Sequence, residues 1–241
     1  MDNHRFLERI YHLQTVCRII SQIKSQLIEE LPHYGHDALF FQNDEITTGL
    51  LNNKTEVKIH LLTGELLYFH NEIGHFVDLT CDGFYERLES IVTKYGLKMP
   101  KAQSMTLKQE CLFEYMTFAK RVNKSLELFR MKLKDHFTQV HLWPHGFDFS
   151  VESFINKDNG QIGVGVSPGD DIYEAPYLYV NPYPFSENII HQPLPIGKWH
   201  TLGWKGIKVE WNEIDIKEEQ DISQDIYSLY TQLQCIIFRK L

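Results

Sequence analysis

The stretch Val140–Glu152, VHLWPHGFDFSVE, follows a long amphipathic segment and opens the half of the sequence that is rich in Trp, Tyr and Pro. From Phe147 onward, apolar residues alternate with polar ones, which is the period-two pattern of a strand with one buried face. Just before this strand, Pro144 has no N–H to donate to a sheet and Gly146 relieves a bend. The stretch therefore predicts a bend that leads into a strand and gathers histidine, aspartate and aromatic side chains.

The residues on either side of this stretch carry helix and strand patterns. Apolar residues at three- and four-residue steps predict helices, and short alternating runs between turn residues predict antiparallel strands. Before the stretch, the predicted helices are 5–31, 82–95 and 106–133, with strands within 38–79. After it, the predicted elements are strands at 147–154, 161–166, 177–180 and 204–211 and a helix at 216–238.

Together these patterns predict an α+β fold with mainly antiparallel sheets and long amphipathic helices packed on one side. The order helix, strands, helix occurs twice and suggests two similar α–β–α halves. We expect residues 1–100 to contain the N-terminal helix, antiparallel strands and a helix. Residues 101–241 are expected to contain the long helix, the aromatic- and proline-rich strands and the C-terminal helix, and both regions to form one compact unit.

Composition and charge are typical of a globular protein that does not bind nucleic acid. Hydrophobic residues make up 43% of the 241 residues, which is enough for an ordinary core. The net charge of −8 argues against a nucleic-acid partner, because proteins that bind a phosphate backbone usually present a basic face.

The cysteines and the N-terminus predict the cellular compartment. The four cysteines lie far apart and form no CxxC or zinc-ribbon spacing. The N-terminus MDNHRFLERI lacks the apolar run of a signal peptide, and no stretch approaches the length of a membrane span. We therefore expect a soluble protein of a reducing, bacterial-type cytoplasm that has no membrane partner.

Histidines and a carboxylate beside aromatic residues predict a site in the C-terminal half. A neutral histidine oriented by a carboxylate suits proton transfer near neutral pH, and binding sites are mostly apolar with a few placed polar groups. The catalytic candidates are His141, Asp148 and His200. The ligand-binding candidates are Trp143, His145, Tyr179 and Trp204. Most of the other aromatic residues of this half are interpreted as core.

A divalent metal is an alternative for the same stretch. His141, His145 and Asp148 are the ligand candidates, because imidazole and carboxylate groups suit zinc, iron or manganese. On a regular strand, residues four apart lie about 13 Å from each other, too far for the two histidines to share an ion. A bulge at Pro144–Gly146 would shorten this distance. The other interpretation of His141 is a histidine of the core or its rim.

The segment GVGVSPGDD at 163–171 does not meet the requirements of a phosphate loop, because no Lys-Ser/Thr follows it. Gly163 and Gly165 leave one strand face without side chains. A ligand, or an aromatic side chain of the neighbouring strand, would then approach the backbone closely. We interpret Pro168–Gly169 as a turn, with the following aspartates either capping it or reaching toward a cation.

Four segments within residues 140–206 resemble a bacterial domain family of unknown function. They are HLWPHGFDFS, QIGVGVSPGDD, PYLYVNPYPF and WHTLGWKG. The resemblance implies a strand with a histidine and a following Phe-Asp, then aromatic-proline strands. It matches the family's strand histidine and aspartate to His141 and Asp148, whereas the position of His145 is less fixed. The resemblance implies a fold and no mechanism.

The sequence thus predicts a small-molecule-binding protein or an enzyme, with a His/Asp/aromatic site in the C-terminal half. In this hypothesis His141 or His200 is the general acid or base, Asp148 orients it, and Trp143, Tyr179 and Trp204 form the pocket walls. The alternative is a non-catalytic interaction protein, a homodimer or a partner surface built on the heptad-like C-terminal helix. A further alternative is a metal-dependent enzyme that uses the His/Asp cluster.

Overall fold

The computed structural model describes residues 6–51, 54–71, 73–99, 107–133, 137–155 and 160–238. The chain divides into two compact units. Unit 1 comprises Met1–Leu7, Arg121–His141 and Asp148–Leu241, and unit 2 comprises Glu8–Lys120 and Leu142–Phe147. The units therefore interleave along the chain and do not correspond to the expected regions 1–100 and 101–241. The stretch Val140–Glu152 contributes residues to both.

Unit 2 contains a five-stranded antiparallel sheet with the strand order β1-β2-β3-β4-β5. Its strands are β1 (Phe40–Gln42), β2 (Glu45–Thr47), β3 (Thr55–His60), β4 (Glu65–His70) and β5 (Ile73–Asp78). Its helices are α1 (Phe6–Leu27), which begins at the end of unit 1, the short 3₁₀ helix η2 (Pro32–Tyr34), α2 (Phe84–Thr93) and the first half of α3 (Gln109–Met131).

The core of unit 2 follows from the alternation in its strands. In β3, Val57 and Ile59 are fully buried, whereas the alternate residues Glu56, Lys58 and His60 are half-buried. Val57 pairs with Tyr68 and Ile59 pairs with Leu66, so the buried residues of β3 and β4 share one face. Since each strand follows its neighbour through a short turn, the sheet is a simple meander.

Unit 1 contains a six-stranded sheet with the order β10-β11-β9-β8-β7-β6. Its strands are β6 (His141–Trp143), β7 (Asp148–Ile155), β8 (Gly160–Ser167), β9 (Tyr177–Tyr183), β10 (Lys198–His200) and β11 (Gly206–Glu210). The last residues of β6 are assigned to unit 2. The short 3₁₀ helices η3 (Glu187–Ile189) and η4 (Trp211–Glu213) lie in its connections, and α4 (Glu219–Phe238) ends the described chain.

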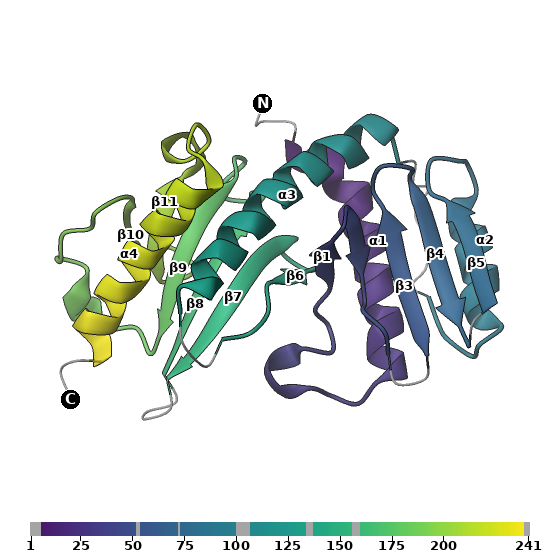
Figure 1. The fold of residues 1–241 in the computed structure, drawn as a ribbon, viewed down its shortest axis with the longest axis horizontal. Helices are drawn as coiled ribbons and strands as arrows, with labels where there is room; N and C mark the ends of the chain where they lie inside the picture. The colour runs from purple at the N-terminus through teal and green to yellow at the C-terminus, as the bar shows by residue number, and fades with distance from the viewer. Residues whose placement is uncertain are drawn as a thin grey trace. The chain divides into compact units, whose positions relative to one another are not determined.

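The apolar stripe of α4 is part of the core of unit 1. Ile222, Ile226, Leu229 and Leu233 are all buried. Figure 1 shows α4 lying across one face of the sheet, and the Tyr230 hydroxyl contacts the Ser153 hydroxyl of β7 at 2.8 Å. The stripe that suggested a dimer surface is therefore occupied by the sheet of the same unit.

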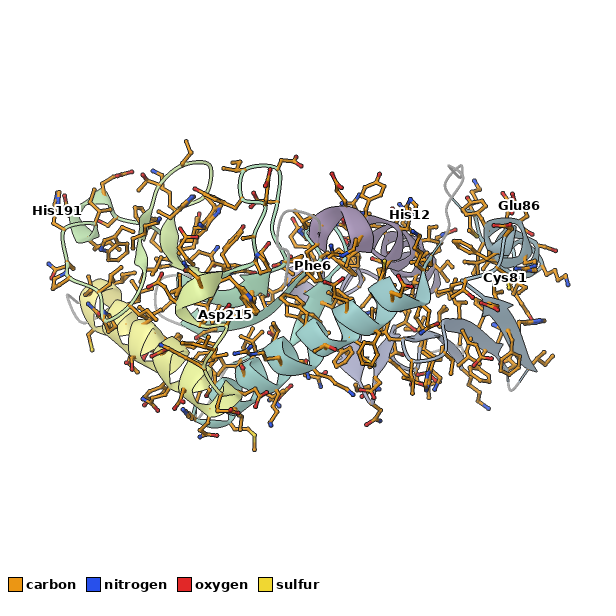
Figure 2. The ribbon with its side chains drawn as sticks, turned by 90° about the horizontal axis from the view of Figure 1, so that it is seen from above. Phe6, His12, Cys81, Glu86, His191 and Asp215 are labelled. Carbon is orange, nitrogen blue, oxygen red and sulfur yellow. The ribbon has the colours of Figure 1, made fainter. Side chains whose placement is uncertain are left out.

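The segment before α4 is held by one arginine of α3. Arg121 donates hydrogen bonds to the carbonyl oxygens of Ile214, at 2.9 Å, and of Asp215, at 2.5 Å, and also to that of Lys217. Figure 2 labels Asp215 at this position. A single guanidinium, with its several fixed donors, thus satisfies three main-chain acceptors and fixes where α4 begins.

The predicted fold class is confirmed: the described residues form helices and two antiparallel sheets in an α+β arrangement. The predicted elements have different limits, and the three-residue strand β10 was not predicted. Phe147, expected on the strand, instead has a left-handed φ of 57° and closes a turn through its N–H to the Trp143 carbonyl, at 2.7 Å. Within the described ranges, no helix is both long and apolar enough to cross a membrane.

Candidate functional site

The strand register of unit 1 places most of its polar side chains on one face of the sheet. Ser150 pairs with Gly165, Gly165 with Tyr179, and Tyr179 with Lys208, so these four positions form a row across the sheet. The neighbouring apolar positions face the other side, where α4 packs. We call the first side the polar face. It comprises Asp148, Ser150, Glu152, Gly163, Gly165, Tyr177, Tyr179, His200 and Lys208.

Two glycines of β8 make room on the polar face for side chains of neighbouring strands. A Cβ added at Gly165 would overlap the phenol of Tyr179. A Cβ added at Gly163 would lie 2.9 Å from both carboxylate oxygens of Glu152. The prediction that an aromatic side chain approaches the backbone at this segment is confirmed, because Tyr179 lies directly over Gly165.

Tyr179 links β9 to β7 across this gap. Its hydroxyl donates a hydrogen bond to Asp148 Oδ2 at 2.5 Å. Burial raises the pKa of the Tyr179 phenol well above its ordinary value, and the negative charge of Asp148 raises it further. Tyr179 therefore stays protonated and acts as a hydrogen-bond donor to the carboxylate.

Glu152 is a carboxylate of the polar face whose environment shifts its pKa. Burial raises its pKa from 4.5 to about 7, and the charge of Asp148 adds to the rise. Two hydrogen bonds oppose the shift: Gln161 Nε2 donates to Oε2 at 2.7 Å, and the Ser150 hydroxyl faces Oε1 at 3.4 Å. Both of these partners are neutral, and the raised pKa of Glu152 lies near neutral pH.

The sequence did not identify Glu152 as a site residue, although Glu152 lies in the stretch Val140–Glu152. The alternating pattern placed it on a polar strand face and gave no reason to distinguish it from a solvated glutamate. Its burial depends on the side chains of β8 and β9, and above all on Gly163, which leaves space for its carboxylate. The glycine pair was the available signal.

His200 is nearly completely buried, with 6% of its surface exposed. Its Nδ1 lies 2.9 Å from the Trp204 carbonyl oxygen and its Nε2 lies 2.8 Å from the Tyr173 hydroxyl. Because a carbonyl only accepts, Nδ1 carries a proton, and in its neutral form the ring accepts at Nε2 from the Tyr173 O–H. The ring also stacks on Trp204 with 4.0 Å between centroids.

Tyr177 joins this aromatic group to the loop after β8. Its ring lies parallel to that of Trp204, and its hydroxyl donates to Asp170 Oδ2 at 2.6 Å. Asp170 Oδ1 accepts from the main-chain N–H groups of Ile172 and Tyr173. Asp170 therefore caps a turn at residues 170–173, and capping is one of the two roles predicted for the aspartates after Pro168–Gly169.

The predicted site residues are divided between the two units. Asp148, Tyr179, Trp204 and His200 lie in unit 1, where a hydrogen bond and ring contacts connect all four. His141 also belongs to unit 1, at the beginning of β6. The two remaining candidates are Trp143 and His145, and both belong to unit 2.

In unit 2, these two residues lie at the beginning of a turn. Side chains of α1 bind the main chain of this turn. The rings of Trp143 and His145 are 6.1 Å apart. Gln14 and Arg18 donate hydrogen bonds to the carbonyl oxygens of Pro144 and His145, at distances from 2.8 to 3.3 Å. These contacts fix the turn through its backbone.

The metal candidates do not converge into a ligand set. Among the described residues, which include His141, His145 and Asp148, no three His, Cys, Asp or Glu side chains are close enough together to hold a metal ion.

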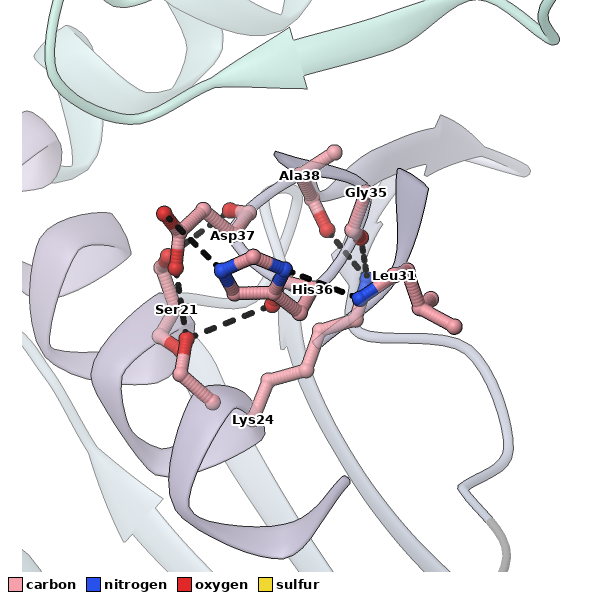
Figure 3. A network of polar contacts seen from close by, with 8 residues as sticks. Ser21, Lys24, Leu31, Gly35, His36, Asp37 and Ala38 are labelled. Carbon is pink, nitrogen blue, oxygen red and sulfur yellow. Dashed lines mark hydrogen bonds and ion pairs between the residues drawn. The ribbon is translucent and has the colours of Figure 1, made fainter. Parts of the chain in front are cut away.

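A second polar network lies in unit 2, around the buried Lys24 (Figure 3). Lys24 Nζ donates to the carbonyl oxygens of Ala38, at 2.5 Å, and of Gly35, at 3.0 Å. Burial lowers the pKa of Lys24 to about 8, partly opposed by the charge of Asp37. Asp37 in turn accepts from the Ser25 hydroxyl at 2.6 Å. Because its partners are mainly carbonyls of the loop before β1, we interpret this network as a structural support for that loop.

Comparisons of the chain with models of protein families, with curated proteins and with solved structures found no match.

Proposed function

We propose that unit 1 binds a small molecule on its polar face and exchanges a proton with it through Glu152. The observation that carries this proposal is the pKa of Glu152, raised to about 7 in a place where its carboxylate is held by neutral donors. Perturbed carboxylates of this kind concentrate at functional sites. A group that titrates near the working pH serves both as acid and as base.

The neighbours of Glu152 supply the remaining parts of such a site. Asp148 provides a second carboxylate, and Tyr179 provides a phenol that stays protonated. Gln161 and Ser150 provide neutral hydrogen-bonding groups beside Glu152. Carboxylates, hydroxyls and an amide next to aromatic rings suit a neutral or cationic polar ligand, because two carboxylates repel an anion.

The role proposed for the histidines changes with this geometry. Both ring nitrogens of His200 already have partners within unit 1, which leaves neither directly available to a ligand. Glu152 is therefore the acid or base in this proposal, and Asp148 with Tyr179 positions the ligand. We further propose a cytoplasmic location. We also propose membership of the bacterial domain family, which the four segments of residues 140–206 support.

Binding on the polar face is tested by a fragment screen followed by NMR. The screen uses neutral and amine-bearing fragments, and the readout is the Gln161 side-chain amide together with the Tyr179 ring signals. We expect hits that shift these signals and that bind at least about ten times more weakly to Glu152→Gln, a loss of about 1.4 kcal/mol. The matched control Glu218→Gln changes an exposed glutamate of the same unit and should bind as the wild type does. Hits that bind Glu152→Gln as tightly as the wild type, or that do not shift these signals, would contradict the proposal.

A further inference from the structure

Tyr173 is held rigidly in the loop between β8 and β9. Its main-chain N–H donates to Asp170 Oδ1 at 2.8 Å, and its carbonyl accepts from the Asp170 N–H at 2.7 Å. The side chain is half-buried, and its ring meets that of Tyr177 edge-on, with 5.6 Å between centroids. The Tyr173 side chain therefore has a fixed position and is partly exposed.

His200 is placed to accept the proton of this phenol. Its Nε2 lies 2.8 Å from the Tyr173 hydroxyl, and its Nδ1–H is fixed on the Trp204 carbonyl oxygen at 2.9 Å. A hydroxyl next to a histidine whose far nitrogen is oriented by an acceptor is the arrangement that activates nucleophiles in many enzymes. Here a main-chain carbonyl orients the histidine and a phenol is the group that loses its proton.

Lys208 supplies a positive charge to the same phenol. Its ammonium nitrogen lies 3.7 Å from the centroid of the Tyr173 ring, and only 2% of the side chain is exposed. Glu210 holds this ammonium at 2.7 Å and also binds Lys198 at 2.7 Å, so the group of three carries a net positive charge. A cation over an aromatic face stabilises the ring more strongly once the ring carries negative charge.

We propose that Tyr173 is a nucleophilic phenol, with His200 as its proton acceptor and Lys208 as the cation that stabilises the phenolate. The proton moves from Tyr173 Oη to His200 Nε2 as Oη forms a bond to an electrophilic acyl or sulfonyl centre. The bond to the leaving group breaks at the same time, the leaving group departs with its electron pair, and the imidazolium returns the proton to it. This inference uses residues other than Glu152 and does not depend on the function proposed above.

Benzenesulfonyl fluoride tests the reactivity of Tyr173 without knowledge of a natural substrate. The phenol oxygen forms a sulfonate ester, and fluoride leaves together with the proton. Peptide mass spectrometry gives the rate at each tyrosine of the intact protein, and Tyr183, which is 66% exposed, is the internal reference. Rates measured in the urea-unfolded chain correct for local sequence effects.

We expect Tyr173 to react faster than Tyr183 in the folded protein, since a positioned base contributes about 100-fold or more. A corrected rate ratio at or below one would overturn the inference, and this comparison needs no variant. In His200→Gln, the Tyr173 rate should drop to about that of Tyr183 or lower, whereas His191→Gln, at an exposed loop histidine (Figure 2), should leave the ratio unchanged. Fast labelling of Tyr173 that persists in a folded His200→Gln variant would also overturn it.

Discussion

The Tyr179 phenol in β9 reaches over Gly165 in β8 and donates a 2.5 Å hydrogen bond to Asp148 in β7. Two side chains from strands that are not neighbours in the sheet meet because the strand between them has no side chain at that position. In the same way, the missing side chain at Gly163 leaves space for the Glu152 carboxylate. The glycines of GVGV thus create the polar face on which the proposed function depends.

Replacing Gly165 by alanine should disturb this arrangement. The new methyl group would overlap the Tyr179 phenol and the carbonyl oxygen of Phe149, so the ring or the strand has to move. We expect the free energy of unfolding in urea to fall by about 1–3 kcal/mol, the usual effect of overpacking. Gly35→Ala is the control, because a methyl group there meets its nearest atoms at 3.4 Å, an ordinary contact. Equal effects of the two substitutions would show that Gly165 is not a special position.

Tyr179→Phe tests the hydrogen bond itself. The substitution keeps the ring over Gly165 and removes the donor that Asp148 accepts from. A hydrogen bond to a charged group contributes about 1.5–3 kcal/mol, so the free energy of unfolding should fall by about that amount. Tyr183→Phe, at a tyrosine that is 66% exposed, should change it by less than about 0.5 kcal/mol. A neutral result for Tyr179→Phe would mean that water replaces the phenol without loss.

Glu152 should make the stability of the protein depend on pH. Its pKa is about 7 in the folded state and 4.5 as the ordinary value, so the folded state binds the extra proton between these values. The stabilisation is complete below pH 4.5 and is lost as the pH rises through 7. The total change is about 3 kcal/mol, since one pKa unit corresponds to about 1.4 kcal/mol.

Urea unfolding at a series of pH values measures this contribution as the difference between wild type and Glu152→Gln. The difference should change with pH between about 4.5 and 7 and be constant above that range. Glu218→Gln should follow the wild-type curve throughout, because Glu218 is exposed. Parallel curves for wild type and Glu152→Gln would contradict the raised pKa.

Lys24 should produce a pH dependence at the alkaline end. Its pKa is lowered from 10.5 to about 8, so the unfolded chain binds more protons between these values and the free energy of unfolding rises with pH there. The rise approaches about 1.4 kcal/mol per pH unit and should be absent in Lys24→Met. Lys98→Met, at an exposed lysine of unit 2, should retain it. Urea unfolding between pH 8 and 10.5 measures the slope, and a slope that survives in Lys24→Met would exclude Lys24 as its source.

Local patterns were sufficient to predict the fold class and the glycine gap. Helical steps and strand alternation depend on neighbours within a few residues, and two glycines of equal parity in GVGV leave a gap on one face wherever the strand pairs. The same alternation placed Asp148 and Tyr179 on strands. Their hydrogen bond was not predictable, because it depends on which strands pair and in which register.

For a similar reason, local patterns could not determine to which unit each remaining candidate residue belongs. Trp143 and His145 were grouped with Asp148 because they are near in sequence, but the chain passes from unit 1 to unit 2 after His141 and returns at Asp148. His200 was correctly expected among aromatic residues. Its closed set of partners, Tyr173 and Trp204, comes from loops whose course no periodic pattern predicts. The burial of Glu152 depends on tertiary contacts for the same reason.

The most direct test of the central claim is a carbon-13 NMR titration of the Glu152 side-chain carboxyl, assigned by its absence in Glu152→Gln. The proposed acid/base role requires a midpoint near pH 7, together with a response of the Gln161 amide at the same midpoint. A midpoint near the ordinary value of 4.5 would contradict this role, because the Glu152 carboxyl would then not exchange protons at neutral pH.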